Sequence, residues 1–289
     1  MRSFTALVNP ISGGGRAAEK WAPLAARISA AGAEVRVELT RSREHAVESA
    51  RAAASDGRTV VAVGGDGLVR DVAEGVAAAR GVMGIVPAGR GNDLARSLGF
   101  PTDVPGLADL LLAGVDAPCD VIELGDLIVL GNVYCGIDSV SNAMINNNRW
   151  LPPKLVYRLA PVRAIVTWRA PRFTLTVDGE VSSVRAHMVV VGNSGAYGHG
   201  LRIVPSARID DGQLDVLVVG NGPKRAIASF MRAAQHGTHV DRPEVSVRTA
   251  REITIAADRA VPVCGDGEEL AALPVTMRIR TDLLRLIRP

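Results

Sequence analysis

Three glycine-rich segments of the chain have the composition of phosphate-binding loops. They are Asn9–Gly15, Gly64–Gly67 and Pro87–Asp93. Each follows a short apolar run that predicts a buried strand, and each precedes a segment with helical spacing. Glycine lets the main chain approach a ligand closely, and N–H groups at the start of a helix bind phosphate. Together the three segments predict a polyphosphate site.

Asp66 is the one charged residue of the second segment, Gly64–Gly67. Because a carboxylate repels phosphate, we expect Asp66 to face a sugar, a hydroxyl or a metal-bound water. The glycines are expected to end the strand over 59–63 without letting a helix begin. No segment is a Walker A motif, and Gly89–Gly91 lacks the third glycine of a dinucleotide fingerprint. A conventional P-loop enzyme or dehydrogenase is therefore disfavoured.

The elements that position these segments alternate between strand and helix. We expect strands at 4–8, 34–39, 59–63, 82–86 and 117–124, and helices at 16–31, 43–55, 69–79, 92–98 and 105–113. Asn92 or Asp93 is expected to cap the short helix over 94–98. Short connections favour a parallel sheet covered on both faces. Ligands of such sheets bind at the carboxyl ends of the strands, where all three segments start.

The pattern changes near residue 124. We expect strands at 127–137 and 173–177, a strand that ends at 191, and later strands at 213–219, 244–248, 252–257, 261–264 and 274–280. Helices are expected at 154–168 and 223–236. Asp178-Gly179 predicts a hairpin turn. Residues 1–124 are thus predicted to form a nucleotide-binding α/β domain. Whether residues 281–289 also return to this domain is left open. Residues 125–280 are predicted to form an antiparallel sandwich with helical inserts, which abuts the first domain across a cleft.

Composition limits the class of protein. The 289 residues suffice for two domains, and 47% hydrophobic with 22% charged residues is ordinary for a soluble chain. A net charge of +3 and 3% aromatic residues disfavour nucleic-acid binding. The three scattered cysteines fit a reducing cytosol, and no apolar run approaches the ~20 residues of a membrane span. We expect a cytoplasmic protein, or one bound peripherally to the inner face of the membrane.

The ordered set of motifs resembles the diacylglycerol kinase catalytic-domain family, in particular its bacterial soluble lipid kinases, over nearly the whole chain. The first half carries Asn9-Pro10-x-Ser12-Gly13, Gly64-Gly65-Asp66-Gly67 and Pro87-x-Gly89-x-x-Asn92-Asp93. The second half carries Gly192-Asn193, Tyr197-Gly198, Pro205-x-Ala207, Asp210-Asp211-Gly212-x-Leu214-Asp215 and Asp266-Gly267-Glu268. NAD kinases share the Gly-Gly-Asp-Gly segment, but the second-half motifs are those of lipid kinases.

The resemblance implies a Rossmann-like α/β first domain, a β-sandwich second domain, and ATP in the cleft between them. The expected nucleotide-binding residues are Asn9, Pro10, Ser12, Gly13, Thr40, Gly64, Gly65, Asp66, Gly67, Arg90 and Asn92. The family's Mg²⁺ motif matches Asp211 together with the main-chain carbonyls of Arg208 and Gln213. Glu268 matches the family's general base, and Asp93 is expected in the catalytic loop.

The chemistry requires such groups independently of the resemblance. Phosphoryl transfer needs positioned reactants and stabilised charge on the phosphate oxygens, and Mg²⁺ needs hard oxygen ligands. A lipid hydroxyl is a poor nucleophile, so a carboxylate within about 3 Å is expected to accept its proton. We expect Glu268 to be that base. A second Asp-Gly-Glu, at Asp178–Glu180, lies between alternating strands and predicts only a turn.

Four positions depart from the family pattern. Leu68, Arg70 and Asp71 stand where relatives usually have threonine, asparagine and glutamate, and Arg90 replaces a threonine. Both arginines are candidate phosphate contacts. The leading interpretation is an ATP- and Mg²⁺-dependent lipid kinase, with diacylglycerol as the default acceptor and phosphatidate as the product. An NAD kinase-like phosphotransferase and a non-catalytic nucleotide-binding regulator are the alternatives.

Residues 149–172 form a basic segment with an apolar stripe. It contains Arg149, Trp150, Lys154, Tyr157, Arg158, Arg163, Trp168, Arg169 and Arg172, with Leu155, Leu159, Val162 and Val166 at helical spacing. Such a segment fits the surface of an anionic membrane, and packing of its stripe on the sandwich is the alternative. The expected partners are therefore the nucleotide, the lipid and this surface, and a homodimer is left open.

Overall fold

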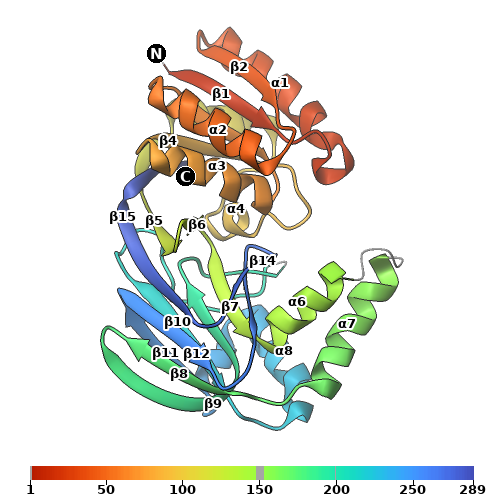
Figure 1. The fold of residues 1–289 in the computed structure, drawn as a ribbon. Coiled ribbons are helices and arrows are strands. Elements are labelled where there is room, and N and C mark those ends of the chain that lie inside the picture. The colour runs from red at the N-terminus through yellow and green to blue at the C-terminus, as the bar shows by residue number, and fades with distance from the viewer. Residues whose placement is uncertain (1, 148–152, 199) are drawn as a thin grey trace.

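The computed structural model, which describes residues 2–147, 153–198 and 200–289, has two lobes (Figure 1). The elements of the first lobe are β1 (Ser3–Val8), η1 (Ser12–Gly14), α1 (Arg16–Ala30), β2 (Glu34–Leu39), α2 (Arg43–Ser55), β3 (Thr59–Gly64), α3 (Asp66–Ala78), β4 (Val82–Pro87), α4 (Asp93–Ser97), α5 (Val104–Ala113) and β5 (Val115–Leu124). Strands and helices alternate as predicted.

The sheet of the first lobe is parallel over β2-β1-β3-β4. Its central strands are mostly apolar because helices cover both faces, and Val60–Val63 are completely buried. Helix α2 packs against α3, and α1 packs against α5. Gly75 permits the first of these contacts, since a Cβ there would lie 2.2 Å from the carbonyl oxygen of Val47. The predicted α/β architecture is confirmed.

The described part of the second lobe is β-rich with three α-helices. Its elements are β6 (Leu127–Val129), β7 (Asn132–Gly136), α6 (Ile137–Asn147), α7 (Pro153–Thr167), β8 (Arg172–Val177), β9 (Glu180–Gly192), β10 (Leu214–Gly220), η2 (Lys224–Ala226), α8 (Ile227–His236), η3 (Thr238–Asp241), β11 (Val245–Ala250), β12 (Glu252–Ala257), β13 (Pro262–Gly265), β14 (Glu268–Ala272) and β15 (Val275–Arg288). The long strand β9 pairs with β8 through its first half and with β7 and β10 through its second half. Apolar side chains of both layers form one buried cluster between them, so the predicted sandwich is confirmed.

Strand β15 passes from the second lobe into the first. Its start pairs with β12, and its end pairs with β5 and, in parallel, with β4. Leu284, Leu286 and Ile287 of this last part belong to the apolar core of the first lobe. The two lobes are therefore joined by a continuous strand as well as by β5.

Three local predictions are wrong. Helix α3 begins directly at Asp66, although the glycines were expected to delay it. The strand expected over 127–137 is divided into β6 and β7, because the chain bends at Gly131 around Asp266, whose Oδ1 would lie 2.3 Å from a Cβ there. Helix α6 and strand β14 were not expected.

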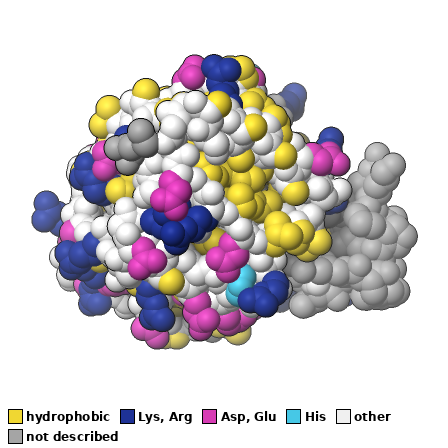
Figure 2. Space-filling view, turned by 90° about the horizontal axis from the view of Figure 1, so that it is seen from above, with side chains coloured by type: hydrophobic (Ala, Val, Ile, Leu, Met, Phe, Trp, Pro, Cys, Tyr) yellow, Lys and Arg dark blue, Asp and Glu magenta, His cyan; other side chains and the backbone are white. Residues whose placement is uncertain are grey.

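On the face seen in Figure 2, basic and acidic side chains are intermixed, and neither charge predominates. This mixture agrees with the net charge of +3. Among the helices that the structure describes, none is long and apolar enough to cross a membrane.

Candidate active site

The three glycine segments, here called loop 1 (9–15), loop 2 (64–67) and loop 3 (87–93), meet at the carboxyl ends of β1, β3 and β4. A Cβ at Gly13 would lie 2.5 Å from the carbonyl oxygen of Ala88, and one at Gly89 would lie 2.4 Å from the Cα of Gly65. At these two positions the loops approach each other so closely that only glycine fits. The hydroxyl of Ser12 donates a hydrogen bond to the same Ala88 carbonyl, at 3.3 Å.

Asn9 begins loop 1, and Thr40 lies beside it. The Oδ1 of Asn9 accepts a hydrogen bond from the backbone N–H of Ile11 at 3.1 Å, which turns the chain after Pro10. The N–H of Thr40 donates to the carbonyl of Val8 at 2.9 Å, which brings the end of β2 to the same edge.

The close approach of loops 2 and 3 gives a first testable prediction. We expect Gly89→Ala to lower the free energy of unfolding by about 1–3 kcal/mol, because the new methyl group collides with Gly65. Nucleotide affinity should fall with it. Gly222→Ala is the matched control, since the nearest neighbour of a Cβ there is 3.9 Å away. Urea denaturation and ADP titration measure both effects, and equal behaviour of the two variants would contradict the contact.

Asp66 stabilises loop 3 through both of its carboxylate oxygens. Its Oδ2 accepts a hydrogen bond from the backbone N–H of Asn92 at 2.8 Å, and its Oδ1 accepts one from Asp93 at 2.9 Å. These two N–H groups begin α4, so Asp66 provides the cap that the sequence assigned to Asn92 or Asp93. Burial, and then the charge of Asp93, raises the pKa of Asp66.

Asn92 stabilises loop 3 from within. Its Oδ1 accepts a hydrogen bond from the N–H of Gly89 at 2.8 Å, and its Nδ2 donates to the Gly89 carbonyl at 3.0 Å. Asn92 has a positive φ of 52°, a conformation that asparagine tolerates better than most residues. The side chain predicted to touch nucleotide is therefore committed to the loop. Arg90, at the tip of the loop, is exposed.

Glu268 reaches loop 2 from the second lobe. It is the first residue of β14, and its Oε1 lies 3.5 Å from where a Cβ of Gly67 would stand. Its Oε2 accepts a hydrogen bond from the guanidinium of Arg70 at 2.8 Å. Arg70 is buried and also bonds Asp71 at 3.0 Å. Arg70, which was expected to contact phosphate, thus donates a hydrogen bond to Glu268 instead.

A cavity of about 330 Å³ lies between the lobes next to these groups. Its acidic lining comes from both lobes and consists of Asp66, Asp93 and Asp266. Burial, with a contribution from the charge of Asp66, raises the pKa of Asp266 to about 7. This acidic cavity has the groups needed to receive a hydroxyl and handle its proton.

A second cavity, of about 620 Å³, lies on the other side of loop 3. It is lined by Gly13, Gly89 and Asn92 and by the basic side chains Arg16, Lys20 and Arg96. Lys20 donates a hydrogen bond to the carbonyl of Pro87 at 2.7 Å, and burial lowers its pKa. The sequence analysis missed Lys20, although a lysine one turn into the helix after a glycine loop is a usable signal.

An apolar cavity of about 220 Å³ lies deeper in the second lobe. Its lining includes Met188, Leu201, Ile203 and Phe230, and Tyr197 lines both it and the acidic cavity. The hydroxyl of Tyr197 donates to Asp138 at 2.7 Å, and burial raises the pKa of Asp138 to about 6. Sequence reasoning missed Asp138 because it did not expect α6.

The predicted metal residues lie at the turn before β10, and this turn contacts β5. The Oδ1 of Asp211 accepts a hydrogen bond from the N–H of Gln213 at 3.0 Å. Burial, with a contribution from the charge of Asp211, raises the pKa of Asp120 and of Asp215. A cation with hard oxygen ligands would relieve this repulsion, so the residues fit Mg²⁺.

Main-chain carbonyls or waters must complete that shell. Within the described part of the chain, no three acidic, histidine or cysteine side chains converge on a metal position. The carbonyls of Arg208 and Gln213 remain the predicted additional ligands.

Comparison with known proteins agrees with this geometry. The family description "Diacylglycerol kinase catalytic domain" matches residues 3–124, and "YegS C-terminal NAD kinase beta sandwich-like domain" matches residues 131–288. A diacylglycerol kinase of Mycobacterium tuberculosis (strain ATCC 25618 / H37Rv) is 31% identical, covering 99% of this chain and 94% of the relative. The chain belongs to the diacylglycerol kinase family. It is therefore a lipid kinase, which transfers phosphate to a hydroxyl, and kinases of this family use ATP.

More distant relatives of the diacylglycerol kinase family extend over most of the chain. The diacylglycerol kinase of Staphylococcus carnosus is 25% identical and covers 79% of this chain and 76% of its own. A solved structure from Bacillus anthracis str. Sterne, 24% identical, superposes with a TM-score of 0.80 and covers 100% of this chain and 97% of that one. The two-lobe fold is thus that of known members.

Proposed function

We propose that the protein transfers the γ-phosphate of ATP to the hydroxyl of diacylglycerol and so forms phosphatidate. The observation that carries the proposal is the position of Glu268, which comes from the second lobe yet places its Oε1 3.5 Å from where a Cβ of Gly67 in loop 2 would stand. A carboxylate held there can accept the proton of an acceptor hydroxyl as its oxygen attacks phosphorus. The buried Arg70 fixes the direction of this carboxylate through the 2.8 Å hydrogen bond.

The remaining roles follow from the loops. Loops 1 and 2 offer backbone N–H groups to the phosphates, and Arg90 is placed to add a charge from the tip of loop 3. Asp93 lines the acidic cavity and is proposed as a second catalytic group beside the acceptor. Mg²⁺ would be held by Asp211 with the carbonyls of Arg208 and Gln213, where it would neutralise the acidic turn before β10.

A lipid acceptor is favoured over a nucleotide acceptor by the apolar cavity. The acidic cavity and the apolar cavity share Tyr197, so an acceptor with its hydroxyl near Asp93 can place an alkyl chain among Met188 and Phe230. Burial of each methylene group there is worth about 0.8 kcal/mol. A dinucleotide offers no such chain, which disfavours the NAD kinase alternative. Leu68 packs against Gly64 as a core residue and gives no support to a non-catalytic regulator.

The decisive experiment is transfer of labelled γ-phosphate from ATP in mixed micelles, with and without Mg²⁺. The acceptors to compare are diacylglycerol, monoacylglycerol, a sphingoid base, ceramide and a polyprenol-like alcohol. We expect labelled phosphatidate to be the main product. Formation of NADP from NAD, or of no labelled lipid, would contradict the proposal.

Helix α7 is the surface that we propose for contact with an anionic membrane. Leu159, Val162 and Val166 have exposed fractions of 55%, 57% and 71%, and basic Arg163 and Arg169 flank them. The stripe at these positions is therefore not packed on the sandwich, which was the alternative interpretation. Apolar side chains insert at the acyl boundary and arginines bind headgroups. Arg149 and Trp150 of the predicted segment lie outside the described residues.

We expect replacement of Leu159, Val162 and Val166 by glutamate to reduce co-sedimentation with anionic vesicles at least tenfold. Activity on diacylglycerol presented in vesicles should fall in parallel, whereas activity on a dispersed short-chain diacylglycerol should persist. The control is the same triple change in another exposed set, Val37, Leu39 and Val181. Unchanged vesicle binding of the α7 variant would exclude this helix as the docking surface.

A further inference from the structure

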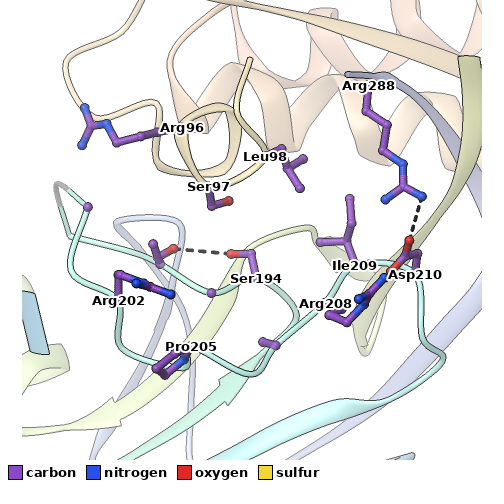
Figure 3. A pocket seen from close by; sticks show the side chains of 14 residues that line it. Arg96, Ser97, Leu98, Ser194, Arg202, Pro205, Arg208, Ile209, Asp210 and Arg288 are labelled. Atoms are coloured by element: carbon purple, nitrogen blue, oxygen red, sulfur yellow. Dashed lines mark hydrogen bonds and ion pairs between the residues drawn. The ribbon is translucent and has the colours of Figure 1, made fainter. Parts of the chain in front are cut away.

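A third cavity between the lobes, of about 540 Å³, has no role in the proposed transfer (Figure 3). Its upper wall is the end of α4, with Arg96, Ser97 and Leu98, and its lower wall is the chain of the second lobe before β10. Arg288, from the end of β15, closes one side. It shares Arg96 with the 620 Å³ cavity beside loop 3, and it shares Ser194 with the acidic cavity.

Positive charge is in excess around this cavity. Four arginines line it, Arg96, Arg202, Arg208 and Arg288, whereas Asp210 is its one carboxylate among the lining residues. The two oxygens of Asp210 are already engaged, at 3.2 Å by Arg208 and at 2.8 Å by Arg288. These arginines hold the pKa of Asp210 below its usual value. Asp210 therefore forms no ion pair with the other two arginines, Arg96 and Arg202.

Arg96 and Arg202 line the cavity from opposite lobes (Figure 3). Arg202 has no side-chain hydrogen bond or ion pair with any described residue. Arg96 donates to the carbonyl of Gly91 at 2.9 Å and lies 3.7 Å from a carboxylate oxygen of Asp93, a distance too long for a strong pair. Its Nη1 would lie 3.0 Å from a Cβ of Gly200, two residues before Arg202. The Arg96 guanidinium of the first lobe thus lies beside the segment of the second lobe that carries Arg202.

We propose that this cavity binds the phosphate group of an organic phosphate, held between Arg96 of the first lobe and Arg202 of the second. Guanidinium groups match a phosphate dianion through paired, charge-assisted hydrogen bonds. The apolar side chains Leu98, Pro205 and Ile209 line the same cavity and suit an organic group attached to the phosphate. The ligand is either a free organophosphate or an anionic lipid headgroup, which share this chemistry.

Binding there would act on the catalytic loop. An anion that draws Arg96 toward Arg202 competes with the Gly91 carbonyl and with Asp93, both in loop 3. It would also bridge the two lobes near the cleft. Occupancy of the cavity is therefore coupled to the position of Asp93, and the site is regulatory rather than catalytic.

The test is calorimetric titration of the full chain with glycerol 3-phosphate, in the presence of saturating ADP so that the nucleotide site is blocked. We expect Arg202→Gln to weaken binding about tenfold or more, and Arg202→Lys to weaken it less. The control is Arg51→Gln, which removes an exposed arginine of α2 that lines none of the cavities. Wild-type binding should also weaken as salt is raised.

A second arm distinguishes the sources of the phosphate. Vesicles that contain phosphatidate are compared with phosphatidylcholine vesicles, and loss of binding by Arg202→Gln in this arm identifies a lipid headgroup. Loss in the glycerol 3-phosphate arm alone identifies a free organophosphate. Binding by Arg202→Gln equal to that of Arg51→Gln in both arms, with unchanged thermal melting, overturns the proposal. Since the readout is binding, the result does not depend on the acceptor that the kinase uses.

Discussion

Glu268→Gln is expected to lower the rate of phosphate transfer by about 10²–10⁴-fold while leaving ATP affinity nearly unchanged. Glutamine keeps an oxygen that can accept the hydrogen bond from Arg70, so the side chain should stay beside loop 2. What it loses is the ability to take a proton at neutral pH. Turnover in mixed micelles and ADP titration separate the two effects, because kcat should fall and the dissociation constant should not.

The second Asp-Gly-Glu of the chain provides the matched control. Glu180 starts β9 after the turn at Asp178 and pairs with Arg248 on the sandwich surface, so Glu180→Gln makes the same chemical change away from the cleft. We expect normal turnover from that variant. Normal turnover from Glu268→Gln would remove Glu268 from the mechanism and leave Asp93 or Asp266 as the candidate base.

The first lobe was predictable from sequence because its signals are local. Runs such as Val60–Val63 can be buried on both faces only in a covered parallel sheet, and loop lengths fixed the alternation. The three glycine segments then had to meet, since the carboxyl ends of parallel strands share one edge. Most of the later sandwich strands were also found, but β14 and the division at Gly131 were not. That bend depends on Asp266, which is 135 residues further along the chain.

The side-chain partners within the site could not be predicted for the same reason. Arg70 was expected to contact phosphate, yet it bonds Glu268, 198 residues away. Asp66 was expected to face a sugar, a hydroxyl or a metal-bound water, and its bonds to two backbone N–H groups of loop 3 were not foreseen. Residue type indicates which groups can interact, whereas the choice among partners is made by tertiary packing. The sequence therefore identified the residues of the candidate site better than their roles.

The double hydrogen bond of Asp66 leads to a second large expected effect. In the Asp66→Asn variant, the remaining oxygen can still accept a hydrogen bond from one of the two N–H groups. The amide NH₂ that replaces the other oxygen is a donor, so it cannot bond the second N–H group. A buried donor left without a partner costs about 1–3 kcal/mol, and the loss of the charge weakens the remaining bond. We expect loop 3 to shift, and kcat to fall about 100-fold because Asp93 moves with it.

A matching substitution at Asp178 tests whether the expected fall in kcat comes from the hydrogen-bond geometry of Asp66 and not merely from the loss of a carboxylate. It also accepts two backbone N–H groups, from Arg251 at 2.9 Å and Glu252 at 2.8 Å, but both bind the same oxygen, Oδ1. Asparagine can therefore keep both bonds, and Asp178→Asn should match the wild type in turnover and in urea denaturation. Asp66→Asn should be impaired in both. A variant of Asp66 that is inactive but fully stable would show that its carboxylate acts on the reactants directly and not through loop 3.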